Sequence, residues 1–275
     1  MKKKGIKLLC LVLTLVIAIG LLAGCGDGDE KPSGNNGQKG SEGMRNDVVI
    51  ATANEPPTMA PHQHSAVAGG YMNILTHNTL FQSNIETLAI EPCLVESYEI
   101  LGDKEWEFKL RKGVKFHNGE EMTTEDVKAS MEYARENASF TNTYSNFWDS
   151  IEIKDDYTFV VKTKEVYAKT LYDMGSHYVL PKSLLESGED ISANPIGTGP
   201  YKFVKWTLGD KIEFEAFEDY WQGAPAIKHM TWRIIPEGSS RTIALEAGEV
   251  DFIVEVDNND LSRLEEDEGI SVINK

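Results

Sequence analysis

The sequence predicts a mixed α/β fold. Short alternations of apolar and polar residues, typical of half-buried strands, recur along the chain, often in pairs separated by turn residues. Between them lie a few stretches with apolar residues at helical spacing. Hydrophobic residues make up 41% of the 275 residues and charged residues 26%, which allows a sizeable core and excludes a disordered chain.

The first expected elements are a strand and a helix. The β-branched run Asp47–Thr52 predicts a strand, and Pro56 and Pro57 end it because proline fits neither a central strand nor a helix interior. Residues Gly70–Phe81 carry apolar side chains on one side and predict a helix.

A strand, a bend and a second helix follow. Trp106–Arg111 alternates as a strand, Gly113 interrupts it, and the alternation of Val114–Phe116 predicts that the strand resumes. Thr123 and Asp126 form a capping box, so a helix is expected to begin immediately after Thr123.

Two hairpins are expected in the middle of the chain. Ile151–Ile153 and Tyr157–Val161 flank an Asp-Asp turn, and Tyr201–Trp206 and Ile212–Phe217 flank a Gly-Asp turn. Each pair joins short alternating runs through residues that favour turns, so each predicts two antiparallel strands.

A short helix and a strand complete the expected elements. Ser239 or Ser240 is suited to cap a helix that Gly248 ends, and Val250–Val254 predicts the strand after it. The order of these elements is that of a mixed α/β chain with flanking helices.

The N-terminus predicts export. An apolar run, Leu8–Leu22, follows four lysines and is shorter than the ~20 residues of a membrane-spanning helix, so residues 1–24 are interpreted as a cleaved signal peptide. The sequence from Leu22 to Cys25 resembles a bacterial lipobox, which implies that the thiol of Cys25 receives a diacylglycerol. The alternative is an ordinary cleavage site beside a chance cysteine.

Residues 25–46 are expected to form the lipidated cysteine and a flexible tether. Residues 26–46 contain six glycines, and a coil of this length spans about 25 Å. The net charge of −17 argues against adhesion to anionic lipid and against nucleic-acid binding. With three cysteines in the chain, a disulfide scaffold is excluded, and Cys93 is interpreted as a small buried residue.

Several blocks in order carry a family resemblance. Trp106–Ala134 closely resembles the signature region of the bacterial extracellular solute-binding proteins of family 5, the binding lipoproteins of peptide and nickel ABC importers. Asn194–Phe203 and Arg241–Asp251 resemble two further family blocks, and Glu55–Thr58 and Pro92–Tyr98 agree with the pattern.

The resemblance implies a periplasmic-binding-protein architecture of type II, in which two lobes close over a ligand. Family members are about twice as long. Residues 47–275 are therefore expected to form the N-terminal part of the solute-binding domain, namely the first lobe and its inserted subdomain, with the second lobe missing. Alone, this form is expected to bind peptides weakly and to expose apolar surface.

The same resemblance suggests ligand contacts at Thr58, Met59, His62 and Gln63, because the matching loop of the family forms one wall of the cleft. The loop departs from its relatives in having Met59-Ala60-Pro61 where they commonly show an aspartate before the proline. His62 and His64, with His77, offered an alternative metal site, but the ligand shell is incomplete, so no metal and no cofactor are expected.

No catalytic motif is present. The sequence lacks the G-x-S-x-G, H-E-x-x-H, Walker A and G-x-G-x-x-G patterns, and the carboxylates near Glu120 and Asp126 are explained by solvation and helix capping. Gly197 and Gly199 are interpreted as scaffold residues that supply positive φ.

The expected function is capture of a peptide-like solute outside the membrane by a lipid-anchored, non-enzymatic protein that delivers it to ABC permease subunits and their ATPase. The alternatives are a nickel or metal-chelate binder of the same family, a sensor or adhesion lipoprotein, and an extracytoplasmic hydrolase.

Replacing Cys25 by serine should release the protein from the membrane fraction, because a hydroxyl is a much poorer nucleophile than a thiol for acyl-anchor transfer. The measurement is detergent partitioning with pelleting. Unchanged partitioning of the Cys25→Ser protein would contradict lipidation at this residue.

Overall fold

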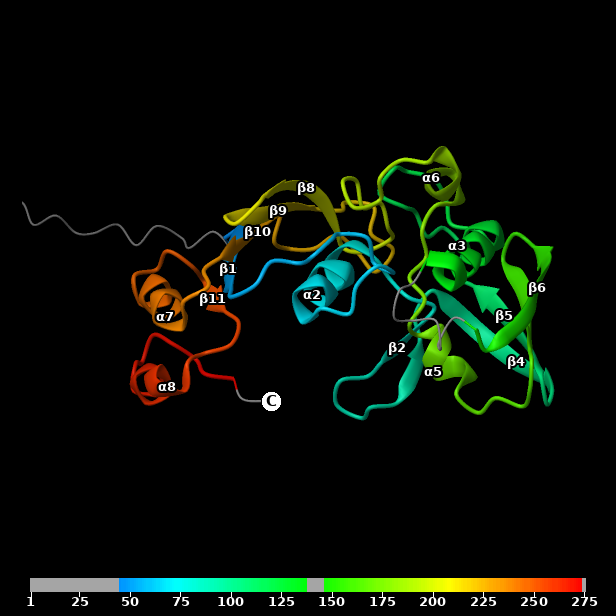
Figure 1. The fold of residues 1–275 in the computed structure, drawn as a ribbon, viewed down its shortest axis with the longest axis horizontal. Coiled ribbons are helices and arrows are strands. Elements are labelled where there is room, and N and C mark those ends of the chain that lie inside the picture. The colour runs from blue at the N-terminus through cyan, green and yellow to red at the C-terminus, as the bar shows by residue number, and fades with distance from the viewer. Residues whose placement is uncertain (1–44, 138–145, 274–275) are drawn as a thin grey trace, which may run out of the picture. The chain divides into compact units, whose positions relative to one another are not determined.

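Two large β-sheets carry the fold, as Figure 1 shows. The computed structural model describes residues 45–137 and 146–273, which lie within one unit of the chain, residues 44–275. The predicted signal peptide, Cys25 and nearly all of the predicted tether lie outside the described residues. The mixed α/β class predicted from the sequence is confirmed.

The first sheet mixes parallel and antiparallel pairs. Strand β1 lies between β10 and β11 and is parallel to both, whereas β10, β9 and β8 pair antiparallel. The carboxyl ends of the three parallel strands therefore meet at one edge. The spatial order is β11 (Phe252–Ile253), β1 (Asp47–Thr52), β10 (His229–Ile234), β9 (Lys211–Ala216) and β8 (Tyr201–Thr207).

Alternation along β1 sends neighbouring side chains to opposite faces of this sheet. Ile50 packs in the cluster that contains Met72 of α2 and Trp232 of β10. Ala51 packs instead with Ala244 of α7 and Leu264 of α8. Both faces are thus covered, by α2 (Val67–Thr76) on one side and by α7 (Gly238–Glu246) and α8 (Asn258–Glu265) on the other.

The second sheet is antiparallel throughout. Phe108 and Phe159 lie opposite each other on neighbouring strands with ring centroids 5.3 Å apart, and Val127 and Met131 of α3 pack in the same core. The spatial order is β4 (Val95–Gly102), β5 (Glu105–Leu110), β7 (Thr158–Thr163) and β6 (Trp148–Asp155), with α3 (Thr124–Asn137) against it.

Short elements connect the two sheets. A two-stranded hairpin precedes the second sheet, and two short helices follow it. These elements are β2 (Phe81–Ser83), β3 (Ile90–Pro92), α5 (Thr170–Met174) and α6 (Lys182–Ser187).

Several predicted elements are confirmed. The strand at residues 47–52, the helix beginning at Thr124 and both hairpins are present. Asp126 accepts a hydrogen bond from the backbone N–H of Thr123, which is half of the expected capping box. Gly248 has φ 70° just after α7, as a helix terminator should.

The predicted helix at Gly70–Phe81 is wrong at both ends. Helix α2 begins at Val67, and the chain becomes extended at His77. The backbone N–H of Gly199 donates to the carbonyl of Thr76, and Phe81 continues into strand β2. Tertiary packing therefore ends the helix before its local pattern does.

Three smaller predictions also fail. Val114–Phe116 forms no strand, only an isolated bridge between Lys115 and Glu121, because the segment turns with its apolar side chains buried. Glu237 occupies the N-cap of α7, so neither Ser239 nor Ser240 caps it. The predicted last strand shrinks to two residues, since only those pair with β1.

Gly197 and Gly199 serve close packing, and the expectation of positive φ is wrong. Neither residue is among those with positive φ. A Cβ atom added to Gly199 would lie 2.5 Å from the carbonyl oxygen of Leu75 and from the carbonyl carbon of Thr76. The glycines are needed because two backbone segments touch here.

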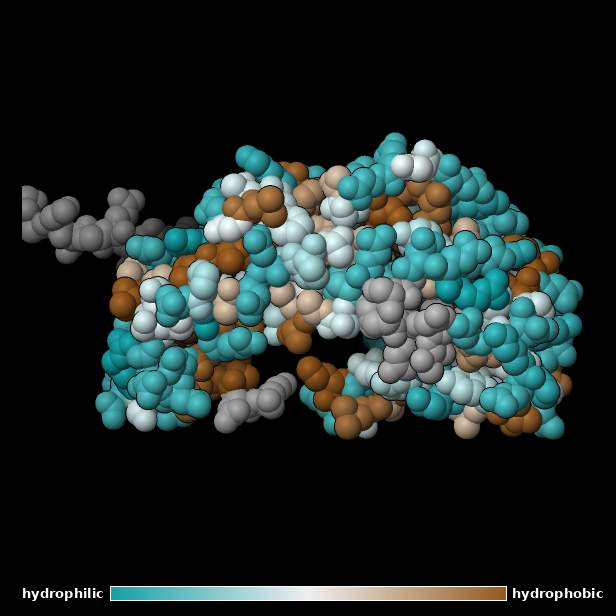
Figure 2. All heavy atoms as spheres, viewed as in Figure 1, coloured by the Kyte–Doolittle hydropathy of each residue, from teal (hydrophilic) through white to brown (hydrophobic). Residues whose placement is uncertain are grey.

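Apolar side chains are exposed on several elements. They include Val67 and Ile74 of α2, Ile85 and Leu88 of the β2–β3 hairpin, and Phe252 of β11. Figure 2 shows apolar surface on the sides of a hollow between α2 and that hairpin. None of the helices within the described residues has the length and apolar content to cross a membrane.

Gly199→Ala should destabilise the protein by about 3 kcal/mol, because an added methyl group collides with backbone that cannot move independently. Gly70→Ala is the matched control. Its Cβ would meet nothing within 4 Å, and removing a helical glycine should stabilise α2 by up to about 1 kcal/mol. Urea unfolding measures both, and equal effects would contradict the close-packing role.

Candidate ligand-binding site

The candidate site is the loop between β1 and α2, at the carboxyl edge of the parallel strands. Ligands of open α/β sheets bind outside the carboxyl ends of strands, so this edge is favoured by topology. Glu55 fixes the start of the loop: its carboxylate accepts hydrogen bonds of 3.0 Å from the indole N–H of Trp206 and from the backbone N–H of Gly209. The loop is therefore pinned to the β8–β9 hairpin.

The four predicted ligand residues occupy different environments. Thr58 is half-buried, and its hydroxyl accepts a hydrogen bond from the backbone N–H of Ala60. Met59 is fully buried in the core beneath α2. Gln63 is exposed, and its side-chain amide donates to the hydroxyl of Tyr133, 3.1 Å away. Thr58 and Gln63 are the accessible members of the set.

His62 is the fourth predicted residue and lies inside the protein. Its Nε2 atom is 3.1 Å from the carbonyl oxygen of Tyr178. Its ring centroid lies 5.8 Å from that of Tyr178, 6.3 Å from that of Tyr133 and 6.5 Å from that of His177. The imidazole therefore attaches the loop to the segment that follows α5, and a contact between His62 and a ligand stays a prediction.

Two further buried histidines belong to this cluster. His77 follows α2, with its Nδ1 atom 2.7 Å from the hydroxyl of Thr76, and its ring meets that of Tyr178 edge-on. The Nδ1 atom of His177 is 2.9 Å from the carbonyl oxygen of Asp173. The cluster joins three segments that are distant in sequence.

His64 lies beside α2. Its Nε2 atom is 3.4 Å from the side-chain nitrogen of Asn73. Its ring fits beside the helix because Gly69 has no Cβ atom, which would collide with it. Alternation along an extended segment predicted that His62 and His64 point the same way, but a local turn separates them.

Burial keeps these imidazoles neutral. It lowers the pKa of His62 and of His177 to about 4, and it holds the pKa of His77 well below its usual value. A neutral imidazole is a competent metal ligand, but the described residues contain no group of three or more His, Cys, Asp or Glu side chains arranged to hold a metal ion. The arrangement packs and positions the loop.

Arg241 is a site residue that inspection of single motifs missed. It is 5% exposed, and its guanidinium donates to the carbonyl oxygens of Ile235, Pro236 and Glu255 at 2.8–2.9 Å. These carbonyls follow β10 and β11, so Arg241 clamps the carboxyl edge beside the candidate loop. Arg241 is the first residue of the Arg241–Asp251 block that resembles the family. Its contacts with the three carbonyls, however, depend on the sheet topology.

Cys93 is buried as predicted, and burial raises the pKa of its thiol to about 11. At neutral pH the thiol is therefore protonated and a poor nucleophile. Its carbonyl oxygen accepts a hydrogen bond from Nε of Arg111. The residue is thus part of the packing around the second sheet.

Comparison with known proteins identifies relatives of this arrangement. The chain is 30% identical to the oligopeptide-binding protein AppA of Bacillus subtilis over 92% of its length and 48% of the relative's. The structure of that protein with a nonapeptide matches with a TM-score of 0.72 and 29% identity, covering 80% of this chain and 46% of the other.

A nickel-related structure matches equally well. NikZ from Campylobacter jejuni in complex with Ni(L-His) gives a TM-score of 0.73 and 28% identity, covering 82% of this chain and 46% of the other. The chain spans about half the length of the relatives it matches. These neighbours confirm the expected periplasmic-binding-protein fold.

A family model matches from residue 89 to residue 275, which is more than half of the chain. Its description is bacterial extracellular solute-binding proteins, family 5 Middle. The resemblance seen in the sequence blocks is therefore confirmed, and the chain belongs to the bacterial extracellular solute-binding proteins of family 5.

Proposed function

We propose that this chain is part of the substrate-binding lipoprotein of an ABC importer and captures di- or oligopeptides outside the membrane for its permease. The observation that carries the proposal is the match, in sequence and in fold, to an oligopeptide-binding protein whose structure holds a nonapeptide. Attachment through a diacylglycerol on Cys25 is part of the same proposal and rests on the lipobox pattern.

The accessible part of the candidate loop suits a peptide ligand. Thr58 offers a hydroxyl and Gln63 an amide, and neither carries a charge. Neutral donors and acceptors can bond to peptide backbone groups, which every sequence shares, without selecting one type of side chain. Met59 and His62 support this surface from within.

Nickel-chelate capture is the second candidate, because NikZ was solved with Ni(L-His). The histidine cluster of this chain is the feature that favours it. Against it, His62, His77 and His177 are each at most 2% exposed, and His62 and His177 already bond to backbone carbonyls. We therefore favour the peptide ligand. No step of the proposal requires catalysis.

Deleting the gene should lower uptake of a labelled nonapeptide and leave uptake of nickel–histidine unchanged. Restoring it with Gln63→Ala should recover only part of the peptide uptake, because the loop loses an exposed amide. Gln82→Ala is the matched control, since Gln82 is an exposed glutamine on β2, outside the loop.

Loss of nickel uptake alone would overturn the peptide proposal in favour of the chelate. Normal uptake of both solutes in the deletion strain would contradict a role in import and favour a sensor or adhesion protein. Equal effects of the two glutamine substitutions would contradict the placement of the ligand at the loop.

Acid should destabilise the protein between about pH 6.5 and pH 4. In that range the histidines of the unfolded chain bind protons, whereas the buried histidines of the folded protein stay neutral. The stabilisation is complete above the unfolded pKa and is lost as the pH falls toward about 4. His62 and His177 each contribute up to about 3 kcal/mol to this loss.

Urea unfolding at pH 7 and at pH 4.5 measures the effect. His177→Leu should flatten the pH dependence, whereas His229→Leu should leave it unchanged because His229 is exposed. A pH dependence that is the same in all three proteins would show that the cluster is not responsible.

A further inference from the structure

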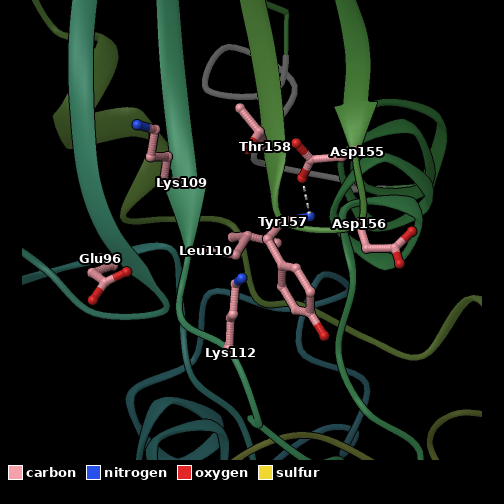
Figure 3. A pocket seen from close by; sticks show the side chains of 8 residues that line it. All are labelled: Glu96, Lys109, Leu110, Lys112, Asp155, Asp156, Tyr157 and Thr158. Atoms are coloured by element: carbon pink, nitrogen blue, oxygen red, sulfur yellow. Dashed lines mark hydrogen bonds between the residues drawn. The ribbon is translucent and has the colours of Figure 1, made fainter.

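One end of the four-stranded sheet carries two adjoining cavities, of about 410 and 400 Å³. Both are lined by Glu96 and Lys112, so we describe them together as one feature, and the first is drawn in Figure 3. We call it the charged groove. Its principal residues are Glu96, Lys109, Arg111, Lys112, Tyr157 and Trp221.

The backbone shapes the charged groove at two points. The pairing of β4 with β5 shifts register between Val95 and Ser97, which leaves Glu96 as the extra residue of a bulge. Bulges redirect side chains and are frequent beside binding sites. Gly113, at φ 74°, turns the chain away directly after Lys112, which keeps the end of β5 open.

Aromatic rings hold two of the cations in place. The ammonium of Lys112 lies 5.1 Å from the centre of the Tyr157 ring, and the guanidinium of Arg111 lies 5.2 Å from that of Trp221. Nε of Arg111 donates to the carbonyl oxygen of Cys93 at 2.7 Å. Among the described residues, none of Lys109, Arg111 and Lys112 forms a salt bridge.

The carboxylates of the charged groove balance these cations. Glu96 and Asp156 are exposed and form no salt bridge within the described part of the chain. Asp155 accepts a hydrogen bond of 2.9 Å from the backbone N–H of Tyr157. In Figure 3 the side chains of Glu96 and Asp156 lie on opposite sides of Lys112 and Tyr157.

This distribution of positive and negative side chains indicates which kind of ligand would bind. A simple anion would be attracted by Lys112 but repelled by Glu96, and a simple cation would meet the reverse. A molecule with both charges satisfies both sets of groups at once. Each cavity is of the size that accepts a small organic ligand.

We propose that the charged groove is a second binding site, for a small zwitterion such as a free amino acid or a short peptide. The ligand carboxylate lies near Arg111 and Lys112, and its ammonium lies near Glu96. The charged groove lies on the four-stranded sheet, whereas the β1–α2 loop follows a strand of the five-stranded sheet. The proposal does not rest on the proposed transport function.

The test titrates the 275-residue chain, kept in detergent, with triglycine. The indole N–H resonance of Trp221 is followed by NMR. Triglycine should shift this resonance. Triglycine that is acetylated and amidated carries no charge and should not. Probes blocked at only one end should bind more weakly than triglycine itself, because each loses one of the two charge contacts.

Glu96→Gln and Lys112→Gln should each weaken triglycine binding about three- to fivefold, as expected for exposed ion pairs. Glu99→Gln on the same strand and Lys164→Gln at the other end of the sheet are matched controls and should change nothing. Gln63→Ala should also leave this binding intact, which separates the groove from the candidate loop.

Three outcomes would overturn the proposal. Equal binding of the uncharged probe would show that charge is not recognised. Equal or tighter binding of the acetylated probe, which keeps only its carboxylate, would show an anion site. Loss of binding in Gln63→Ala with none in Glu96→Gln or Lys112→Gln would place triglycine at the β1–α2 loop.

Discussion

The contact between residues 197–199 and the end of α2 links the parts of the chain that carry the two large sheets. The N–H of Gly199 bonds to the carbonyl of Thr76, and the N–H of His117 bonds to the carbonyl of Gly197. One short segment thus touches α2, which covers the five-stranded sheet, and the turn that leads into α3, which covers the four-stranded sheet. Side chains at these glycines would separate the backbones and loosen both connections.

Local pattern predicted the elements whose residues alternate strongly, such as the strand Asp47–Thr52 and the two hairpins. It failed where a distant segment decides the conformation. The helix predicted at Gly70–Phe81 ends early because of Gly199, and the strand expected at Val114–Phe116 has no neighbour to pair with beyond one bridge. The first outcome depends on the contact between Thr76 and Gly199, which no window of local sequence contains.

For the candidate site, the position given by the resemblance stays a prediction, and the structure adds how the loop is packed. The resemblance to family 5 located the loop after the first strand, whereas the burial of Met59 and His62 required the packing of that loop to be known.

Buried polar side chains of this protein often bond to backbone carbonyls, and Arg241 is an example. Like His62, His117 and His177, it meets backbone carbonyls, although the chain has 44 acidic residues available as partners. Carbonyls satisfy a buried polar group at a defined place without burying a second charge.

The position of β1 between β10 and β11 has a consequence for how the chain folds. The first strand ends at Thr52, and its two parallel partners begin at His229 and Phe252, so this sheet cannot close until synthesis has passed Ile253. All four strands of the other sheet lie between Val95 and Thr163, and they can pair earlier because the loops to be closed are shorter. During translation the four-stranded sheet is therefore complete before the five-stranded one, and β1 remains unpaired, with its edges open to other chains, until β10 has been synthesised.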